Sequence, residues 1–406
     1  MKILQVNCVY KTGSTGKIAY DIHTELLDRG YESVVCYGRG TEINDKNVYK
    51  TCGEVYSRFN NLLSRFTGIM YGGCFFSTNK LISVIKKEKP DIVHLHCING
   101  YFVNIYRLIN WLKKNKIKTV LTLHAEFMHT ANCGYAFECE KWKTGCGKCP
   151  CLKKETKSFL FDGTARSFRK MKKAFDGFNK DLVVVSVSNW IKSRAEQSPI
   201  LNGKKHTVIV NGLNIDNFYP RDVEELKKRL ELQSGKTVLF VTPAFSLDPN
   251  HIKGGYYVAE LAKMLPDMKF VVVGNTNKDV QLPKNVIDIG RVENQPKLAE
   301  YYSVADVMVI TSKSDNYPTV CLESNCCGTP VVGFDVGGIS ETIFAGMGQT
   351  VPHGNLPALM EAVKEYAVAK ASLPKETVDM CRERNSRSRM ANDYIDLYKD
   401  LLEGQN

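Results

Sequence analysis

Short runs of apolar residues alternate with longer amphipathic stretches through most of the chain. The apolar runs predict buried strands, and stretches with apolar residues every three or four positions predict helices. The strands are expected at residues 2–9, 32–38, 91–97, 118–124, 181–188, 236–242, 269–274, 305–312 and 329–334. Amphipathic helices are expected between them, for example at 16–30, 79–90 and 101–115. This alternation predicts an α/β fold with parallel sheets that carry helices on both faces.

The alternation starts a second time near the middle of the chain. Residues 206–220 contain a strand, the Asn211-Gly212 turn and Pro220, a combination that suits a hinge between domains. A length of 406 residues also fits two or three domains of about 150 residues each. We expect two Rossmann-like domains and a final amphipathic helix that returns to the first domain. The predicted parts are 1–208, 209–388 and 389–406.

Residues 312–338 place two acids around the start of a predicted helix. Ligands bind beyond the carboxyl ends of parallel strands, and a strand is predicted to end at residue 312. Pro318 fits a first helical turn, whose free N–H groups suit a phosphate. Inside the helix, the Glu323 carboxylate can accept two hydrogen bonds from a ribose diol, and Asp315 can bind hydroxyls of a second sugar or orient the loop. This predicts a sugar-nucleotide pocket; an acid that only favours the helix dipole, followed by a surface glutamate, is the alternative.

The net charge of +12 is spread unevenly along the chain. Residues 1–210 contain 34 Lys and Arg against 17 Asp and Glu, whereas the remainder is mildly acidic. A basic first half favours contact with anionic lipid head groups or a pyrophosphate acceptor, although a plain solvated surface explains it too. The lysines are not interleaved with stacking aromatics, so nucleic acid is disfavoured as a partner. No apolar run approaches the roughly 18 residues of a membrane span.

The first ten residues, MKILQVNCVY, are too polar for a signal peptide and predict a buried strand. Without a secretion signal, the fourteen cysteines are expected to be reduced thiols. We therefore expect a cytoplasmic protein that binds peripherally to the inner face of the plasma membrane.

The segment DNYPTVCLESNCCGTPVVGFDVGGISE resembles the donor-binding signature of retaining glycosyltransferases of family 4. That signature has two acids separated by seven residues and then Gly-Thr-Pro-Val-Val; here Asp315 stands at the first acid and Glu323 at the second. The segments TVLTLHAEF, VIVNGLNIDNFYP and KGGYYVAELA agree with the same family, so the resemblance covers nearly the whole chain. It implies the GT-B fold, in which two Rossmann-like domains face a central cleft.

The resemblance also implies an activity. It indicates a retaining hexosyltransferase that moves a sugar from a UDP- or GDP-linked donor to a saccharide or polyprenyl-pyrophosphate-linked acceptor. The pathway would be the biosynthesis of a bacterial polysaccharide such as a capsule, an O-antigen or an exopolysaccharide.

Individual residues receive roles only through this resemblance. Glu323 would hold the donor ribose, Lys253 would neutralise the donor diphosphate, and His124 would face the donor sugar. Lone histidines at strand ends are otherwise often structural, and we expect structural roles for His94 and His96. The implied catalytic residues are His124, Lys253 and Asp315, and the implied donor-binding residues are Gly13, Gly16, Lys253, Asn316, Tyr317, Pro318, Thr319 and Glu323.

The chain departs from the family in one respect. Family members often have an arginine shortly before the lysine, whereas this chain reads VTPAFSLDPN there. Charge neutralisation would therefore depend more on Lys253, or would be assisted by Arg291 or by a cation of the first domain.

The resemblance implies a front-face displacement. The acceptor hydroxyl attacks from the side on which the diphosphate leaves, and the departing phosphate oxygen takes the acceptor proton. This mechanism requires no protein base and no cofactor. An Asp-x-Asp motif in a glycosyltransferase context is absent from the sequence, so metal-independent catalysis is expected.

Five of the fourteen cysteines crowd into the loop 126–158. Four thiolates within 17 residues can bind one tetrahedral structural zinc ion, and the last pair has the Cys-x2-Cys spacing of zinc knuckles. The candidate ligands are Cys133, Cys139, Cys146 and Cys149, with Cys151 as a spare. Reduced thiols that pack the loop, or disulfides, are the alternatives.

Two other functions compete with sugar transfer. A sugar-nucleotide epimerase can share this fold, but it needs more cleft carboxylates and histidines than the sequence offers. A non-catalytic nucleotide-sugar sensor or scaffold is the other. An NAD-dependent dehydrogenase is disfavoured because no Gly-x-Gly-x-x-Gly follows the first predicted strand.

Overall fold

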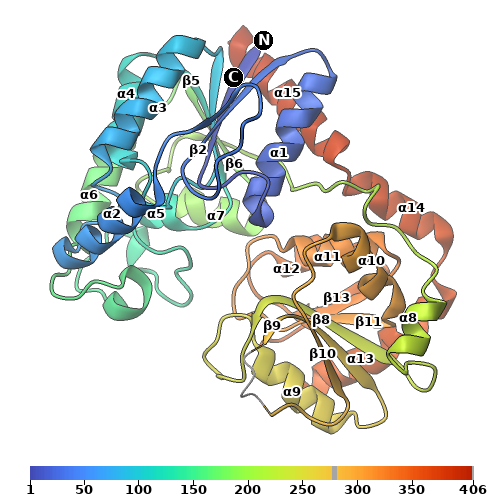
Figure 1. Cartoon of the computed structure of the whole chain (residues 1–406). Helices are drawn as coiled ribbons and strands as arrows, with labels where there is room; N and C mark the ends of the chain where they lie inside the picture. The colour runs from blue at the N-terminus through green and yellow to red at the C-terminus, as the bar shows by residue number, and fades with distance from the viewer. Residues whose placement is uncertain (277–280, 405–406) are drawn as a thin grey trace. The chain divides into compact units, whose positions relative to one another are not determined.

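The computed structural model describes residues 1–276 and 281–404. The chain divides into two compact units, residues 1–210 with 390–406 (unit 1) and residues 211–389 (unit 2). Each unit is built on a parallel sheet flanked by helices (Figure 1). Residues 277–280 of the predicted second domain and 405–406 of the predicted final helix lie outside the described residues.

The sheet of unit 1 has seven parallel strands in the order β3-β2-β1-β4-β5-β6-β7. Their bounds are β1 (Lys2–Asn7), β2 (Glu32–Tyr37), β3 (Val48–Lys50), β4 (Ile92–Leu95), β5 (Lys118–Leu123), β6 (Leu182–Ser186) and β7 (Lys205–Val208). The direction in which strands are added reverses between β1 and β4, as in a Rossmann sheet. Apolar side chains fill these central strands because both faces of the sheet are covered.

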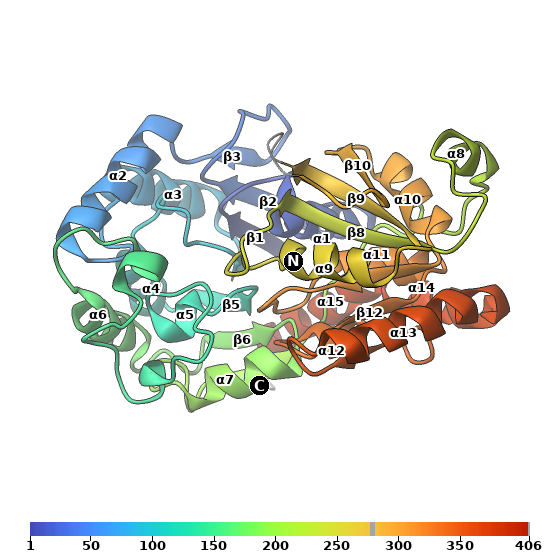
Figure 2. The same ribbon diagram turned by 90° about the horizontal axis from the view of Figure 1, so that it is seen from below.

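The helices of unit 1 connect these strands. They are α1 (Gly13–Asp28), α2 (Glu54–Thr67), α3 (Phe75–Glu88), α4 (Ile105–Lys114), α5 (Phe127–Thr130), α6 (Thr164–Phe175) and α7 (Asn189–Gln197), with single turns at Lys141–Lys143 and Leu152–Thr156. Helix α4 begins four residues after the predicted start because the Asn104 side chain caps it by accepting a hydrogen bond from the Arg107 N–H. Neither β3 nor α2 was predicted from the sequence. Helix α2 lies at the rim of its unit in both views (Figures 1 and 2).

Unit 2 repeats the architecture with six parallel strands in the order β10-β9-β8-β11-β12-β13. The strands are β8 (Thr237–Phe245), β9 (Lys269–Thr276), β10 (Val286–Gly290), β11 (Val307–Ile310), β12 (Val331–Phe334) and β13 (Gly348–Val351). The helices are α8 (Glu224–Arg229), α9 (Gly255–Met264), α10 (Gln295–Val304), α11 (Thr319–Cys326), α12 (Ile339–Thr342), α13 (Leu356–Ala369) and α14 (Lys375–Arg384), with a 3-10 turn at Lys370–Ser372. Helices α9 and α13 share one hydrophobic core with this sheet.

The last helix, α15 (Arg387–Glu403), packs on unit 1 rather than on the unit that precedes it in sequence. Its buried side chains share a core with α1, which lies beside it (Figure 1), and with β1, β4, β5 and β6. The Tyr398 hydroxyl is 2.7 Å from His94 Nδ1, and the Tyr394 hydroxyl is 2.9 Å from Thr122 Oγ1. The predicted return of the C-terminal helix to the first domain is confirmed.

Candidate active site

Loops that follow β8 and β11 meet in unit 2 where the strand order reverses. In the sheet, β8 and β11 are neighbours, and the loops leave from their carboxyl ends. Lys313 N–H donates to the Ile252 carbonyl at 2.8 Å, and Thr311 Oγ1 donates to the Gly254 carbonyl at 2.9 Å. Ligands of open α/β sheets bind at such a topological switch point.

The same two loops bring together two of the predicted catalytic residues. Lys253 Nζ lies 2.7 Å from Asp315 Oδ2, although the residues are 62 positions apart. The Lys253 side chain is 25% exposed and the Asp315 side chain 13%, so the pair is partly accessible from solvent. An ammonium group carries three N–H donors, so a lysine anchored by one carboxylate can also bind an anion.

Helix α11 begins directly after this loop and carries Glu323. The Tyr302 hydroxyl, from α10, donates to Glu323 Oε2 at 2.7 Å. Burial, followed by the charge of Glu323, raises the pKa of Tyr302 well above its usual value, so the phenol stays protonated and donates. Tyr302 therefore fixes the orientation of the carboxylate. Tyr302 was not predicted to have a role, although a buried tyrosine usually needs a hydrogen-bond partner for its hydroxyl.

The residues between Asp315 and Glu323 form the end of the loop and the first turn of α11. Pro318 is the N-cap and Thr319 the first helical residue. Asn316 and Tyr317 are buried, and burial raises the pKa of Tyr317 to about 12. Their part in donor binding stays a prediction. The Tyr317 hydroxyl has no hydrogen-bond partner among the residues that the structure describes.

Gly337, after β12, supports the Asp315 loop at close range. A Cβ there would lie 1.9 Å from the Asp315 carbonyl oxygen, and the next residue, Gly338, donates its N–H to that oxygen at 2.9 Å. We expect Gly337→Ala to displace the Asp315 loop and to lower kcat/KM for the predicted sugar transfer by about 10²-fold, because misplacing a site residue by about 1 Å can cost that much. Steady-state kinetics would measure the loss.

Gly346→Ala is the matched control for this prediction. Gly346 also has a positive φ, of 79°, but no atom would lie within 4 Å of its Cβ. The control therefore shares the backbone strain and lacks the collision. Equal losses of activity in the two variants would contradict the proposed support of Asp315.

In unit 1, His124 lies at the end of β5 in a chain of side-chain contacts. His124 Nε2 is 3.2 Å from His96 Nδ1, and His96 Nε2 is 3.0 Å from Gln5 Oε1. Burial lowers the pKa of both histidines below the usual value, so both are neutral near pH 7. A neutral imidazole suits hydrogen bonding to a sugar hydroxyl better than it suits charge neutralisation.

The two glycines predicted to bind the donor lie in the first turn of α1, after β1. Gly13 has a φ of 64°, and a Cβ at Gly16 would approach the Val9 Cγ2 to 3.1 Å. They belong to unit 1, whereas Lys253 and residues 315–323 belong to unit 2. Their role in phosphate binding stays a prediction.

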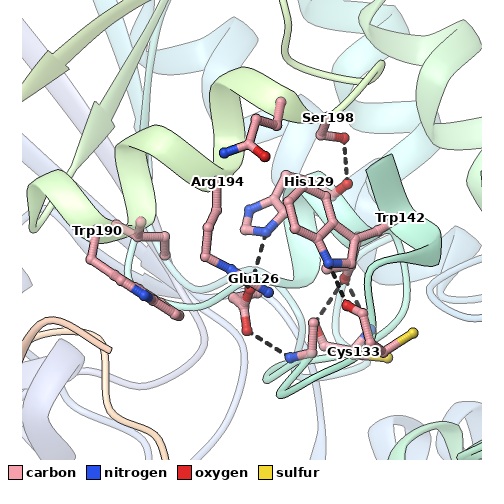
Figure 3. A network of polar contacts seen from close by, with 12 residues as sticks. Glu126, His129, Cys133, Trp142, Trp190, Arg194 and Ser198 are labelled. Carbon is pink, nitrogen blue, oxygen red and sulfur yellow. Dashed lines mark hydrogen bonds and ion pairs between the residues drawn. The ribbon is translucent and has the colours of Figure 1, made fainter. Parts of the chain in front are cut away.

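A buried network of polar contacts around Glu126 was not predicted from the sequence (Figure 3). Glu126 Oε1 accepts a hydrogen bond from Arg194 Nε at 2.6 Å, and its Oε2 accepts one from the Ala136 N–H at 2.6 Å. The Arg194 guanidinium lies 4.7 Å from the Trp142 ring and 4.9 Å from the Trp190 ring. Through these contacts, the network connects the segment after His124 with residues 136–142 of the cysteine-rich loop and with α7. The one signal in the sequence was a carboxylate within the otherwise apolar run AEFM.

The charge state of Glu126 follows from its partners. Burial by itself raises the pKa of this carboxyl, but the hydrogen bond and charge of His129 and the charge of Arg194 outweigh it. The net pKa lies below its usual value, so Glu126 is ionised at neutral pH. A buried ion pair of this kind is costly to break from one side only.

The four candidate zinc ligands line one small cavity together with Trp142. All four are free thiols, and burial raises the pKa of Cys146 to about 11. In the part of the chain that the structure describes, no group of three or more His, Cys, Asp or Glu is placed to hold a metal ion. Structural zinc therefore stays a prediction.

Two further features of unit 2 are a hollow that none of the predicted donor-binding residues lines and the surface residue Arg291, whose help in charge neutralisation stays a prediction. The hollow, of about 1230 Å³, lies at the amino ends of the strands of unit 2, with Thr237 and Asp306 in its wall. Arg291 lies at the surface, 64% exposed, and pairs with Glu293 at 3.1 Å.

Known families match both units. The family model described as Glycosyltransferase Family 4 matches residues 15–217, half of the chain, and the one described as Glycosyl transferases group 1 matches residues 236–367. A putative colanic acid biosynthesis glycosyl transferase, WcaC of Escherichia coli, is 25% identical over 99% of this chain and 100% of its own length. The N-acetyl-alpha-D-glucosaminyl L-malate synthase of Bacillus anthracis is 22% identical over 91% of this chain and 86% of its own.

Solved structures of low sequence identity share the fold. Sucrose-phosphate synthase from Thermosynechococcus elongatus gives a TM-score of 0.70 at 16% identity, covering 99% of this chain and 100% of the other. Anabaena HepE in complex with UDP-glucose gives 0.63 at 14% identity, covering 98% and 100%. With the two Rossmann-like units described above, these similarities confirm the GT-B fold, and the chain belongs to glycosyltransferase family 4.

Proposed function

We propose that this glycosyltransferase is a retaining hexosyltransferase of bacterial polysaccharide biosynthesis. Its donor would be a UDP- or GDP-linked sugar, and its acceptor a saccharide or a polyprenyl-pyrophosphate-linked saccharide. One observation carries the proposal: the Lys253–Asp315 pair lies in the loops beside the start of α11, which contains Glu323. The colanic acid relative and the UDP-glucose complex of HepE support the pathway and the donor class.

The donor diphosphate would be held by charge and by backbone dipoles. The Lys253 ammonium is a cation, and the first turn of α11 has N–H groups without partners in the helix. Leaving-group charge grows as the glycosidic bond breaks, so groups that neutralise the diphosphate stabilise the transition state. Glu323, oriented by Tyr302, would accept hydrogen bonds from the ribose hydroxyls.

From the family resemblance we infer that the transfer step is a front-face displacement. The bond between the anomeric carbon and the diphosphate oxygen breaks, and the acceptor oxygen bonds to the same face of that carbon. The acceptor proton passes to the departing phosphate oxygen, so no side chain has to act as a base. The configuration at the anomeric carbon is thereby retained.

An assay with labelled nucleotide sugars tests the proposal. A transferase releases the nucleoside diphosphate only when an acceptor is present, and NMR of the product reports its anomeric configuration. Interconversion of the donor sugar without acceptor would instead identify an epimerase. Binding without turnover would identify a sensor, and an inverted product would overturn the retaining mechanism.

Glu323→Gln is expected to raise the KM for the donor by about 10- to 100-fold, because hydrogen bonds to a charged group contribute about 1.5–3 kcal/mol. The amide oxygen can still accept from the Tyr302 hydroxyl, so the melting temperature should change little. Initial rates over a range of donor concentrations measure the effect. Glu361→Gln, an exposed change on α13, is the control. An unchanged KM would remove Glu323 from the donor site.

A further inference from the structure

Helix α2 is amphipathic, but its apolar side faces solvent. Val55 is 83% exposed and Phe59 is 60% exposed. The exposed apolar residues of α2 recur at spacings of three, four and seven positions, so they form one stripe along the helix. The apolar side chains of this stripe are Val55, Phe59, Leu62, Leu63 and Phe66. The side chains that α2 buries are Ser57, Asn60 and Ser64. A surface helix usually buries its apolar stripe, so α2 has the reverse arrangement.

Specific hydrogen bonds hold the polar side of α2 against unit 1. Ser57 Oγ donates to the Gly100 carbonyl at 3.0 Å, and Asn60 Oδ1 accepts from the Cys74 N–H at 2.7 Å. A Cβ at Gly73 would lie 2.2 Å from that same Asn60 oxygen, so the fit is close. The outward direction of the apolar stripe is therefore fixed by the contacts of the opposite side.

Two neighbouring segments extend this apolar surface. The Phe66 and Phe159 rings are 5.2 Å apart, and the Tyr56 and Phe76 rings are 6.0 Å apart. The added exposed side chains are Phe75, Phe76, Phe159, Leu160 and Phe161. With the stripe of α2 they make ten of the sixteen exposed large hydrophobic side chains in the described part of the chain. Apolar surface gathered in this way marks an interaction site.

The surroundings of this surface are basic. Arg58 is exposed within the stripe of α2, and Lys80 is exposed one turn after Phe76. Residues 148–173, which include the 159–161 segment, contain nine Lys and Arg against two Asp and Glu. A partner that complements both the apolar side chains and the surrounding cations has an apolar interior beneath a negatively charged surface layer.

We propose that the α2 face, defined as the exposed side chains of α2 with residues 75–76 and 159–161, docks on an anionic lipid bilayer. Interfacial helices bind in this way, with apolar side chains in the acyl boundary and cations at the head groups. A second copy of the chain fits less well, because a two-fold contact would bring the same cations together. None of the helices in the described part of the chain has the length and apolarity of a membrane span. This inference rests on the proposed function in one respect only: docking on the bilayer would bring the enzyme to a lipid-linked acceptor.

Vesicle co-sedimentation tests the α2 face without any sugar donor or acceptor. The chain is expected to bind vesicles of phosphatidylglycerol and phosphatidylcholine, and to bind pure phosphatidylcholine more weakly. In the variant F59S/L62S/F66S, binding to the mixed vesicles should fall by about 10-fold or more, because three apolar side chains no longer enter the bilayer. The replaced side chains are exposed, so the melting temperature should stay the same.

Two further variants separate apolar insertion from charge. V368S/M380S removes two exposed apolar side chains from unit 2 and should leave vesicle binding unchanged. R58E/K80E/K157E should weaken binding to the mixed vesicles and abolish the preference for phosphatidylglycerol.

Three outcomes would overturn the proposal. The first is that the wild-type chain fails to sediment with the mixed vesicles. The second is that F59S/L62S/F66S sediments as well as the wild type. The third is that the wild-type chain forms a dimer that persists in the presence of vesicles, whereas F59S/L62S/F66S is a monomer. Because sugar transfer is not measured, failure here leaves the proposed activity untouched. Failure of the activity assay likewise leaves vesicle binding as an independent result.

Discussion

Lys253→Met should lower the kcat of sugar transfer by about 10²–10³-fold, the loss typical of removing one preorganised group that stabilises transition-state charge. Methionine keeps much of the side-chain length and removes the cation. The charge that develops on the departing diphosphate then has to be stabilised without the ammonium. In the variant, Asp315 loses the ammonium group that lies 2.7 Å away in the wild type. Its negative charge is then no longer compensated and repels the diphosphate. Rapid-quench measurement of nucleoside diphosphate release, with donor at saturation, isolates this step.

Lys263→Met is the matched control for that experiment. Lys263 lies on α9, which begins two residues after Lys253, and its side chain is 61% exposed and paired with Glu260. Its replacement removes the same charge from the same unit, away from the Asp315 loop. If Lys253→Met and Lys263→Met had the same kcat, the leaving-group role of Lys253 would be wrong.

Ending the chain after Arg389 should unfold unit 1. The removed residues contribute six buried side chains to its core, namely Met390, Tyr394, Ile395, Leu397, Tyr398 and Leu401. Each fully buried apolar side chain contributes about 1.5–3 kcal/mol, so their combined loss is comparable to the ~5–15 kcal/mol stability of a typical domain. His94, buried beside Tyr398, would also lose a hydrogen bond.

Circular dichroism and limited proteolysis would measure this effect. A chain that ends after Glu403 keeps all of α15 and serves as the control. We expect the control to melt like the full chain and the shorter chain to be digested within residues 1–210. A protease-resistant unit 1 in the shorter chain would show that α15 is dispensable for folding.

The central strands could be predicted because each is a run of buried, mostly β-branched residues. VMVI in β11 and LVVVS in β6 show this directly, since both faces of a central parallel strand are covered. The edge strands β10 and β13, with sequences VIDIG and GQTV, were missed. An edge strand is partly solvated and needs fewer apolar residues, so its local pattern resembles that of a loop.

Residues of the candidate site could be predicted where their own segment resembles the family, as for Lys253 and Asp315, but the contacts between segments could not. The segment from Asp315 to Glu323 is continuous and carries a family signature, and its helix was expected. Tyr302 and Gly337 act on that segment from other elements, through a hydrogen bond to Glu323 and through close contact with the Asp315 carbonyl. The residues next to them in the sequence do not show these contacts, because each contact depends on which element lies opposite in the folded unit.

By itself, the sequence determined the alternation of strands and helices, the two Rossmann-like units and the acids at the start of α11. These features depend on hydrophobic periodicity and on neighbouring residues, which a linear pattern contains. Only the tertiary structure decided that Lys253 meets Asp315, that Tyr302 orients Glu323, and that α2 turns its apolar stripe outward. The period of a helix fixes which residues share a side, whereas contacts between distant segments, such as that of Asn60 with Cys74, decide which side is buried.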